Sequence, residues 1–419
     1  MTLLKTLADI FSTTCTACGA CAAMCPALTA AGPKESPSVI QEQVRSFLEG
    51  GPPGDTVIDR ALLCNECYQC TLDTCPVGLD PMRTNLLLRG CLRSQGAWSQ
   101  GDFIPPSDPA GDERVLAALL TTEDEFQRIT VPSKKGDGRY LFFPGCNIYC
   151  MPDKLLTAMD IMDRLTENWT FLPGLIHCCG GNHSTAGDLD AELAAMNGLV
   201  DAFQTDEFEA IVLWCPTCVT LFHLSEVDLP TIPFARFVAD RLPGHANVQD
   251  DTGPITLHDP CKNFFLGIDP EAPRELLAQV TGESVLEMPR KNYCCGYGLL
   301  AGSPDKGGRW IESRLEEASN TGAGTMVNIC HGCHWFFTGP EWSPDIRIVN
   351  YVTLAGQALG IDHEERFLNW RKLNDPDQII DDIWTYMGER VEHLPFSRQQ
   401  VEKTIRRMFD PIEFDALSG

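Results

Sequence analysis

The sequence that decides the fold is Cys178-Cys179-Gly180, which recurs as Cys294-Cys295-Gly296. Each vicinal pair lies between one upstream cysteine and a downstream C-x-x-C pair, and matching cysteines of the two copies are 115 or 116 residues apart. The two sets are Cys146, Cys178, Cys179, Cys215 and Cys218, and Cys261, Cys294, Cys295, Cys330 and Cys333. A repeat in this register predicts two similar folded units, each gathering five sulfurs from three loops.

Five sulfurs in one place favour an iron–sulfur cluster. Thiolates are soft ligands that suit iron–sulfur clusters, zinc or cuprous copper. A tetrahedral zinc site is complete with four ligands, so a fifth cysteine is surplus to it. Disulfides are a further alternative, but we recognise no secretion signal and disulfides are rare in the cytosol. We therefore predict a cluster in each unit, with zinc or structural thiols as the alternatives.

Two further cysteine groups precede the repeat. The first reads Cys-Thr-Ala-Cys-Gly-Ala-Cys-Ala-Ala-Met-Cys-Pro and ends at Pro26, which is the spacing of a bacterial ferredoxin. The second has four residues, not three, between its last two cysteines and also ends in Cys-Pro. In two-cluster ferredoxins the cysteine before proline ligates the other cluster. We therefore expect two [4Fe–4S] clusters, one on Cys15, Cys18, Cys21 and Cys75, and one on Cys64, Cys67, Cys70 and Cys25.

The composition restricts the class of protein. The 419 residues carry a formal charge of −26, which argues against nucleic acid or an anionic membrane as a direct ligand. No apolar run approaches the roughly 18 residues that span a bilayer. We expect a cytoplasmic protein, in one alternative attached peripherally to a membrane complex. Cys91 has no partners at ligand spacing and is interpreted as a packed thiol.

The predicted organisation is a helical two-cluster domain followed by two α/β units. We expect the helical domain over 1–94, a linker over 95–138 with one short helix at 113–120, the α/β units over 139–250 and 251–360, and a helical extension over 361–419. Apolar periodicity predicts helices at 38–48 and 82–93, the second capped by Asp80. The extension is expected to form two amphipathic helices separated at Pro395.

Short apolar runs predict three parallel strands in each α/β unit. They lie at 140–143, 169–172 and 210–214 in the first unit, and at 255–257, 285–288 and 326–329 in the second. A cysteine-bearing loop follows every one of these runs. Open α/β sheets bind their ligands at the carboxyl ends of strands, so the cysteine loops of each unit should converge there. The fold class is α/β, with Rossmann-like units.

The cysteine patterns carry a family resemblance over roughly residues 10–360. The repeat resembles the CCG domains of the heterodisulfide reductase catalytic subunit, and the N-terminal motifs resemble its ferredoxin-type subunit, here fused in one chain. The resemblance implies a noncubane [4Fe–4S] cluster on each five-cysteine set, with the substrate disulfide cleaved between the two. Both sets are complete here, which favours a chemically active subunit. Similar chains also serve as iron–sulfur subunits of glycolate, lactate and glycerol-3-phosphate dehydrogenases and of membrane complexes.

Several residues beside the clusters are candidates for proton transfer. His177, His183, His258 and His331 flank cysteines, and a proton donor is useful when a disulfide becomes two thiols. His183 and His331 are our preferred pair because each follows a cluster loop, although hydrogen bonding to backbone or sulfur is the alternative role. Cys150 competes with Cys146 as a ligand, and the repeat offset favours Cys146.

These observations predict an electron-transfer oxidoreductase subunit that reduces or forms a disulfide or thiol substrate. No Gly-x-Gly-x-x-Gly follows a strand, so no flavin or nicotinamide is expected in this chain. A flavoprotein, hydrogenase, dehydrogenase or quinone-reactive membrane subunit is therefore expected as redox partner. The alternatives are a non-catalytic relay for a flavin-dependent dehydrogenase or quinone-linked complex, and a zinc-dependent scaffold.

Overall fold

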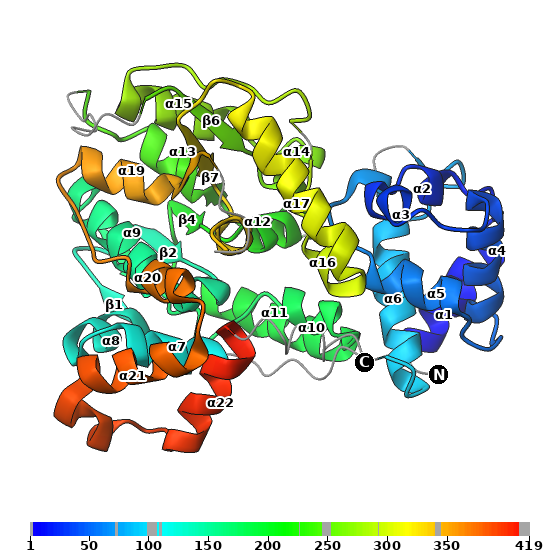
Figure 1. Cartoon of the computed structure of the whole chain (residues 1–419), viewed down its shortest axis with the longest axis horizontal. Helices are drawn as coiled ribbons and strands as arrows, with labels where there is room; N and C mark the ends of the chain where they lie inside the picture. Colours follow the sequence, from blue (N-terminus) through cyan, green and yellow to red (C-terminus); the bar gives the residue numbers. More distant parts are fainter. Residues whose placement is uncertain are drawn as a thin grey trace.

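The computed structural model describes residues 3–71, 74–98, 107–108, 111–225, 227–244, 253–291, 293–339 and 345–409. It divides into a helical N-terminal part, on the right in Figure 1, and a larger α/β body on the left. The α/β fold class and the two repeated units predicted from the cysteine register are confirmed by this architecture.

The N-terminal part consists of short helices wrapped around two cysteine-lined cavities. They are α1 (Leu3–Thr14), α2 (Ala20–Ala23), α3 (Pro26–Ala31), α4 (Pro37–Leu48), α5 (Asp55–Leu62), the 3-10 turn η1 (Gln69–Thr71) and α6 (Pro81–Ser94). As predicted, the Asp80 carboxylate caps α6 by accepting from the backbone N–H groups of Met82 and Arg83. One face of α4, α5 and α6 forms an apolar core with α1, which includes Val44, Phe47, Ala61 and Leu88.

The first α/β unit holds a five-stranded sheet in the order β1-β3-β2-β4-β5. Its strands are β1 (Ser133–Lys134), β2 (Tyr140–Phe143), β3 (Trp169–Phe171), β4 (Ala210–Leu213) and β5 (Thr231–Pro233). All pairs are parallel except β1 with β3. The helical elements between and after these strands are η2 (Asn147–Cys150), α9 (Pro152–Leu165), α10 (Gly181–Thr185), α11 (Leu189–Phe203), α12 (Pro216–Leu224) and α13 (Phe234–Ala239).

The second unit repeats this order with a shorter sheet. Its strands β6 (Ile255–His258), β7 (Thr325–Asn328) and β8 (Arg347–Asn350) are all parallel. The strand predicted at 285–288 is wrong: only one isolated parallel bridge joins Leu286 to Thr256 there. Leu286 is 38% exposed although Met288 is buried, and the backbone pairing does not extend beyond this one bridge. Its helices are α14 (Cys261–Phe265), α15 (Glu271–Thr281), α16 (Tyr297–Gly302), α17 (Pro304–Ser319), α18 (His331–Phe337) and α19 (Tyr351–Ala358).

The segment predicted as a linker is partly folded onto the first unit. Helix α7 (Asp112–Leu120) has six consecutive buried residues at 115–120, and α8 (Glu123–Thr130), which the sequence did not predict, starts at a Thr122–Glu125 capping box. Strand β1 adds an edge to the sheet. Residues 99–106 and 109–110 of the predicted linker lie outside the described part of the chain.

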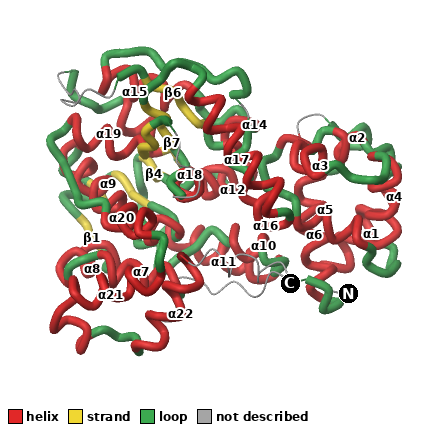
Figure 2. Tube along the Cα trace, viewed as in Figure 1, coloured by secondary structure: helices red, strands yellow, loops and turns green. Residues whose placement is uncertain are grey.

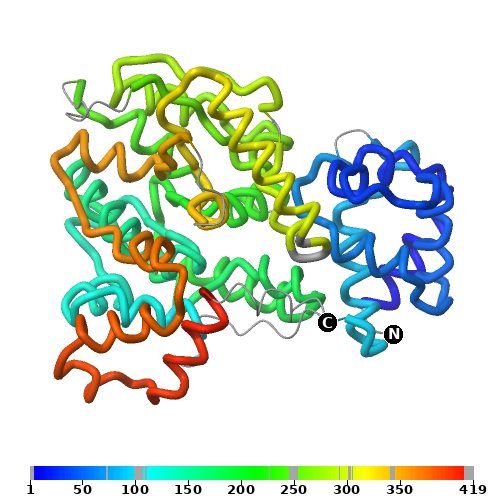
Figure 3. The backbone as a smooth tube through the Cα atoms, in the orientation of Figure 1, coloured from blue at the N-terminus to red at the C-terminus, as the bar shows by residue number. Residues whose placement is uncertain are grey.

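The C-terminal extension packs against the body rather than projecting from it. It forms α20 (Arg366–Leu373), α21 (Pro376–Met387), the 3-10 helix η3 (Gly388–His393) and α22 (Arg398–Phe409), so it holds more than the two predicted helices. Figures 2 and 3 show α21 and α22 beside α7 and α8 at one end of the body. Thr404 donates to Asp112 at 2.9 Å, and Arg390 donates to the Thr121 carbonyl at 2.7 Å.

We predict that Trp370→Ala loosens this extension. The Trp370 side chain is fully buried and its Nε1–H donates to Asp382 at 2.7 Å. Truncating a buried tryptophan costs about 3–5 kcal/mol in unfolding free energy. The apparent melting temperature should fall clearly. Leu373→Ala in the same helix, where Leu373 is 41% exposed, is the control and should leave it nearly unchanged.

Candidate iron–sulfur and disulfide-reducing sites

The first N-terminal cavity is lined by Cys15, Cys18, Cys21 and Cys75. Three of these cysteines come from one tight loop, where Ala17 and Gly19 take left-handed backbone conformations with φ of 52° and 79°. A Cβ on Gly19 would lie 2.4 Å from the Pro37 carbonyl carbon, so only glycine fits this turn against α4. Gln41 of α4 accepts from the Cys21 thiol at 3.2 Å.

The second cavity is lined by Cys25, Cys64, Cys67 and Cys70. Asn85 of α6 donates to the Cys64 sulfur at 3.4 Å. The cysteine before proline in each motif therefore lies with the first three cysteines of the other motif. This grouping supports the exchange of ligands expected from the ferredoxin spacing.

Arg60 lies between the two cavities and lines both. Its side chain is 2% exposed. Burial acts to lower the pKa of Arg60, but the charges of Cys25, Cys70 and Cys21 raise it above its ordinary value. A permanent buried cation here offsets the negative charge of thiolates on both sides. Arg60 was not among the residues expected from the sequence, where it is an ordinary basic residue four positions before Cys64.

The first five-cysteine set converges at the carboxyl end of the β1–β5 sheet. Cys146 follows β2, Cys178 and Cys179 follow β3, and Cys215 and Cys218 lie at and in the first turn of α12. The Cys146 and Cys178 sulfurs are 3.8 Å apart. Hydrogen bonds between thiols continue from Cys178 to Cys179, and on to Cys218 and Cys215.

Cys150, the competing candidate, lies outside this chain of thiols. It is 7% exposed and belongs to the apolar core around η2 and α9. Burial raises its pKa well above the ordinary value, and the charge of Glu113 adds to this effect. The structure thus places Cys146, and not Cys150, with the other cysteines of the first set.

The second set converges in the same way at the β6–β8 sheet. Cys261 opens α14 after β6, Cys294 and Cys295 precede α16, and Cys330 and Cys333 open α18 after β7. Thiol hydrogen bonds run from Cys261 to Cys294 and Cys295, and on to Cys333 and Cys330. The Trp310 indole N–H also fixes this loop by donating to the Cys294 carbonyl at 2.8 Å.

The donor chemistry of all four sites fits iron–sulfur clusters. The hydrogen bond with Cys178, burial and the charges of Cys178 and Cys215 raise the pKa of Cys179 well above its ordinary value, although the hydrogen bond with Cys218 acts to lower it. Neighbouring thiolates cannot all ionise without a cation. Within the part of the chain that the structure describes, no three His, Cys, Asp or Glu side chains are arranged to hold a single metal ion. Four thiols around a cavity suit a larger, polynuclear cluster.

His331 joins the two five-cysteine sets. It is the first residue of α18 and is 2% exposed. It hydrogen-bonds Cys215 of the first set, while its chain neighbour Cys330 belongs to the second. Burial lowers the pKa of His331, but the Cys215 and Cys330 thiolates outweigh it and raise the pKa above its ordinary value. The two sets therefore face each other across one imidazole.

The other candidate histidines have different surroundings. His183 lies on α10, and burial lowers its pKa; the charges that act on it are Asp188, Arg93 and Glu192. Burial lowers the pKa of the half-buried His177 as well. His258 ends β6 fully buried and accepts from Arg314 Nε at 3.1 Å. Of the preferred pair, the structure thus places His331 against cluster cysteines, and the role of His183 stays a prediction.

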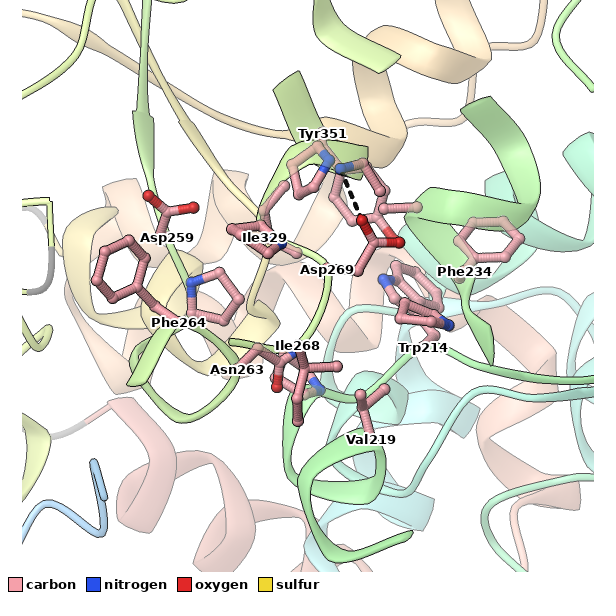
Figure 4. A pocket seen from close by; sticks show the side chains of 17 residues that line it. Trp214, Val219, Phe234, Asp259, Asn263, Phe264, Ile268, Asp269, Ile329 and Tyr351 are labelled. Carbon is pink, nitrogen blue, oxygen red and sulfur yellow. Dashed lines mark hydrogen bonds between the residues drawn. The ribbon is translucent and has the colours of Figure 1, made fainter. Parts of the chain in front are cut away.

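A pocket lies where the two units meet (Figure 4). Residues from the carboxyl ends of both sheets line it, among them Trp214 after β4, Ile329 after β7 and Tyr351 after β8. The wall is largely apolar, with Phe234, Phe264 and several prolines. The Trp214 ring lies 6.3 Å from the His331 ring, so the pocket adjoins the histidine between the two sets.

Every helix among the described residues is too short or too polar to cross a lipid bilayer.

Comparison with known protein families agrees with this architecture. The 4Fe-4S dicluster domain model matches residues 14–80, and the cysteine-rich CCG domain model matches residues 140–223 and 255–338. A dicluster domain followed by two CCG domains makes the chain an iron–sulfur protein of the heterodisulfide reductase type.

Individual relatives span both of the functional classes expected from the sequence. The chain is 26% identical to a subunit of the dihydromethanophenazine:CoB–CoM heterodisulfide reductase of Methanosarcina acetivorans, over 84% of this chain and 94% of the relative. It is 25% identical to the corresponding subunit from Methanosarcina mazei, over 83% and 94%. It is also 27% identical to lactate utilization protein A 1 of Bacillus cereus (strain AH820), over 44% of this chain and 86% of the relative.

We predict that anaerobically purified protein is brown and contains roughly 16 iron atoms, from four clusters of about four irons each. Iron and acid-labile sulfide assays measure this directly. Stoichiometric zinc with fewer than about four irons per chain would contradict the cluster assignment.

A second prediction distinguishes the two cysteines near η2. Cys146→Ser should remove one ligand of the first five-cysteine set and reduce iron content by up to about four atoms, the content of one cluster. Cys150→Ser is the matched control and should leave the EPR spectra of all sites unchanged. The reverse pattern would show that the first unit uses a ligand shifted by four residues, from Cys146 to Cys150.

Proposed function

We propose that the chain passes electrons from its two ferredoxin-type sites to its two CCG sites, which reduce or form the disulfide of a small thiol substrate. The observation that carries this proposal is the meeting of two complete five-cysteine sets at His331. Disulfide reduction separates two sulfurs, and paired sites offer each sulfur a place. The chain is an iron–sulfur electron-transfer subunit of the heterodisulfide reductase type; the disulfide chemistry is the further step proposed here.

The spacing of the sites supports a linear route. Burial raises the pKa of Cys67 well above its ordinary value, and the next cause is the negative charge of Cys261. The second ferredoxin-type site is therefore close to the second CCG site. Cys330 of that site in turn feels the charge of Cys215 in the first. We infer the order of sites as Cys15 group, Cys25 group, Cys261 group and Cys146 group.

The residues around the CCG sites handle the substrate and its protons. Bound clusters supply one-electron transfer and electrophilic iron, whereas the complete reaction converts one disulfide, two electrons and two protons into two thiols. His331, buried between the sets and bonded to Cys215, is placed to hold one of these protons. The apolar pocket beside Trp214 adjoins the same point and is the candidate entry for the substrate.

A partner protein must supply or accept the electrons. The named relatives from Methanosarcina are subunits of a heterodisulfide reductase, which agrees with a redox partner such as a flavoprotein, hydrogenase, dehydrogenase or quinone-reactive membrane subunit. Lactate utilization protein A favours the second candidate, a relay subunit of a flavin-dependent dehydrogenase. A relay would bind no disulfide and would show no change in its EPR spectrum on adding thiol.

Single substitutions at the two vicinal pairs test the proposal. Cys178→Ser and Cys294→Ser should each abolish disulfide reduction, because each removes one of the paired sites. The ferredoxin-type sites should still be reduced by dithionite in both variants, which controls for folding. Undiminished turnover of a disulfide in either variant would leave that CCG site a structural or relay centre.

A further inference from the structure

Glu66 lies inside the second ferredoxin-type motif, between Cys64 and Cys67, yet its carboxylate turns toward the α/β body. Its side chain has three partners from three parts of the chain. Arg89 of α6 donates at 2.5 Å, Thr185 of the first CCG unit donates at 2.6 Å, and Lys262 of the second donates at 3.2 Å.

This group is buried, and it sets one carboxylate against two cations. Glu66 is 8% exposed and Arg89 is 2% exposed, and the Lys262 side chain is 17% exposed. Burial alone would raise the pKa of Glu66, but Lys262 and Arg89 outweigh it and lower the pKa to about 2. One carboxylate thus pairs with two cations in a site with little access to water, where each pair is strong only while its geometry is kept.

The backbone at Glu66 is also held in an unfavourable conformation. Its φ is 52°, in the left-handed region that non-glycine residues rarely adopt. Arg89 fixes this loop further by donating to the Cys64 carbonyl at 2.8 Å and the Ala61 carbonyl at 3.1 Å. A glycine would relieve the strain, so the side chain and not the backbone accounts for a glutamate here.

The same loop is joined to the second CCG unit at the neighbouring residue. The Asn65 amide oxygen accepts from the backbone N–H groups of Gly298 and Leu299 at the start of α16. A Cβ on Gly298 would lie 2.8 Å from the Cys64 carbonyl oxygen, so the two backbones are as close as glycine allows. Cys67 directly follows Glu66 and Cys261 directly precedes Lys262, so the Glu66–Lys262 ion pair lies beside one cysteine of each site.

We propose that Glu66 is a positioning residue that sets the distance between the second ferredoxin-type site and the second CCG site through its ion pair with Lys262. This inference rests on the proposed electron route, and it assigns control of the electron-transfer rate between these two sites to residues that are not ligands. Lys262 directly follows Cys261, so the ion pair ties one ligand loop of each site to the other. A shift between these loops changes the rate of electron transfer without changing the ligands of either site.

The test compares three variants by freeze-quench EPR after mixing with dithionite. Glu66→Gln and Lys262→Met should keep wild-type iron content and ferredoxin-type spectra, yet slow reduction of the CCG sites by about tenfold or more, since small displacements of positioned partners cost up to about a hundredfold in rate. Lys262→Arg keeps a cation opposite Glu66 and should restore the rate. Lys262→Met also leaves the Glu66–Arg89 pair intact, so it remains informative if Glu66→Gln folds poorly.

Glu192→Gln is the matched control. Glu192 pairs with Arg83 at 3.0 Å and also joins the N-terminal part to the body, but through α11 of the first CCG unit and not through the Cys261 loop of the second. It should leave the rate unchanged. Hydrogen exchange supplies a readout independent of the clusters: the Gly298 and Leu299 amides should exchange faster in Glu66→Gln and Lys262→Met, and at the wild-type rate in Glu192→Gln.

Two outcomes separate this proposal from the proposed function. If wild-type protein reduces its CCG sites and both Glu66→Gln and Lys262→Met do so at the same rate, Glu66 has no positioning role. If wild-type protein never reduces its CCG sites from the ferredoxin-type sites, the electron route itself is wrong.

Discussion

The structure depends on gathering eighteen motif cysteines into four groups, most of them buried or half-buried, where negative charge is costly. Ligand thiolates need cations nearby, and iron is one source of positive charge. Basic side chains of the chain supply further positive charge at three positions: Arg60 between the ferredoxin-type sites, Arg89 beside Cys64, and Lys262 beside Cys261. Although the whole chain has a formal charge of −26, these interior positions are locally basic.

The features that sequence predicted well are those with a local or periodic cause. The offset of 115 or 116 residues fixes two equivalent units, and apolar runs located β2, β4 and β7 to within a residue at each end. The Asp80 cap followed from its position before Pro81. The ferredoxin spacing alone was enough to predict which cysteines line each cavity. The grouping in the structure supports that predicted exchange of ligands.

The features that sequence missed depend on contacts between distant segments. The run 285–288 has the composition of a strand, but its backbone gains only one bridge and Leu286 stays partly exposed. Helix α8 and strand β1 follow a proline-rich segment and depend on packing against the first unit. Glu66, Arg60 and Lys262 are ordinary charged residues in sequence, and only the fold shows that they are buried beside thiols.

The internal repeat makes the two CCG sites similar, and contact with the N-terminal part makes them different. Helices α10 and α16 are equivalent in the repeat, each following a vicinal cysteine pair, and both contact the helical part, α10 at α6 and α16 at α5. Glu66 reaches both units, through Thr185 and Lys262. The hydroxyl of Thr185 offers only a neutral hydrogen bond, whereas Lys262 offers an ion pair next to Cys261. The two CCG sites are similar, but the ion pair holds only the second one close to the proposed source of electrons. In the proposed route, electrons therefore reach the second CCG site before the first.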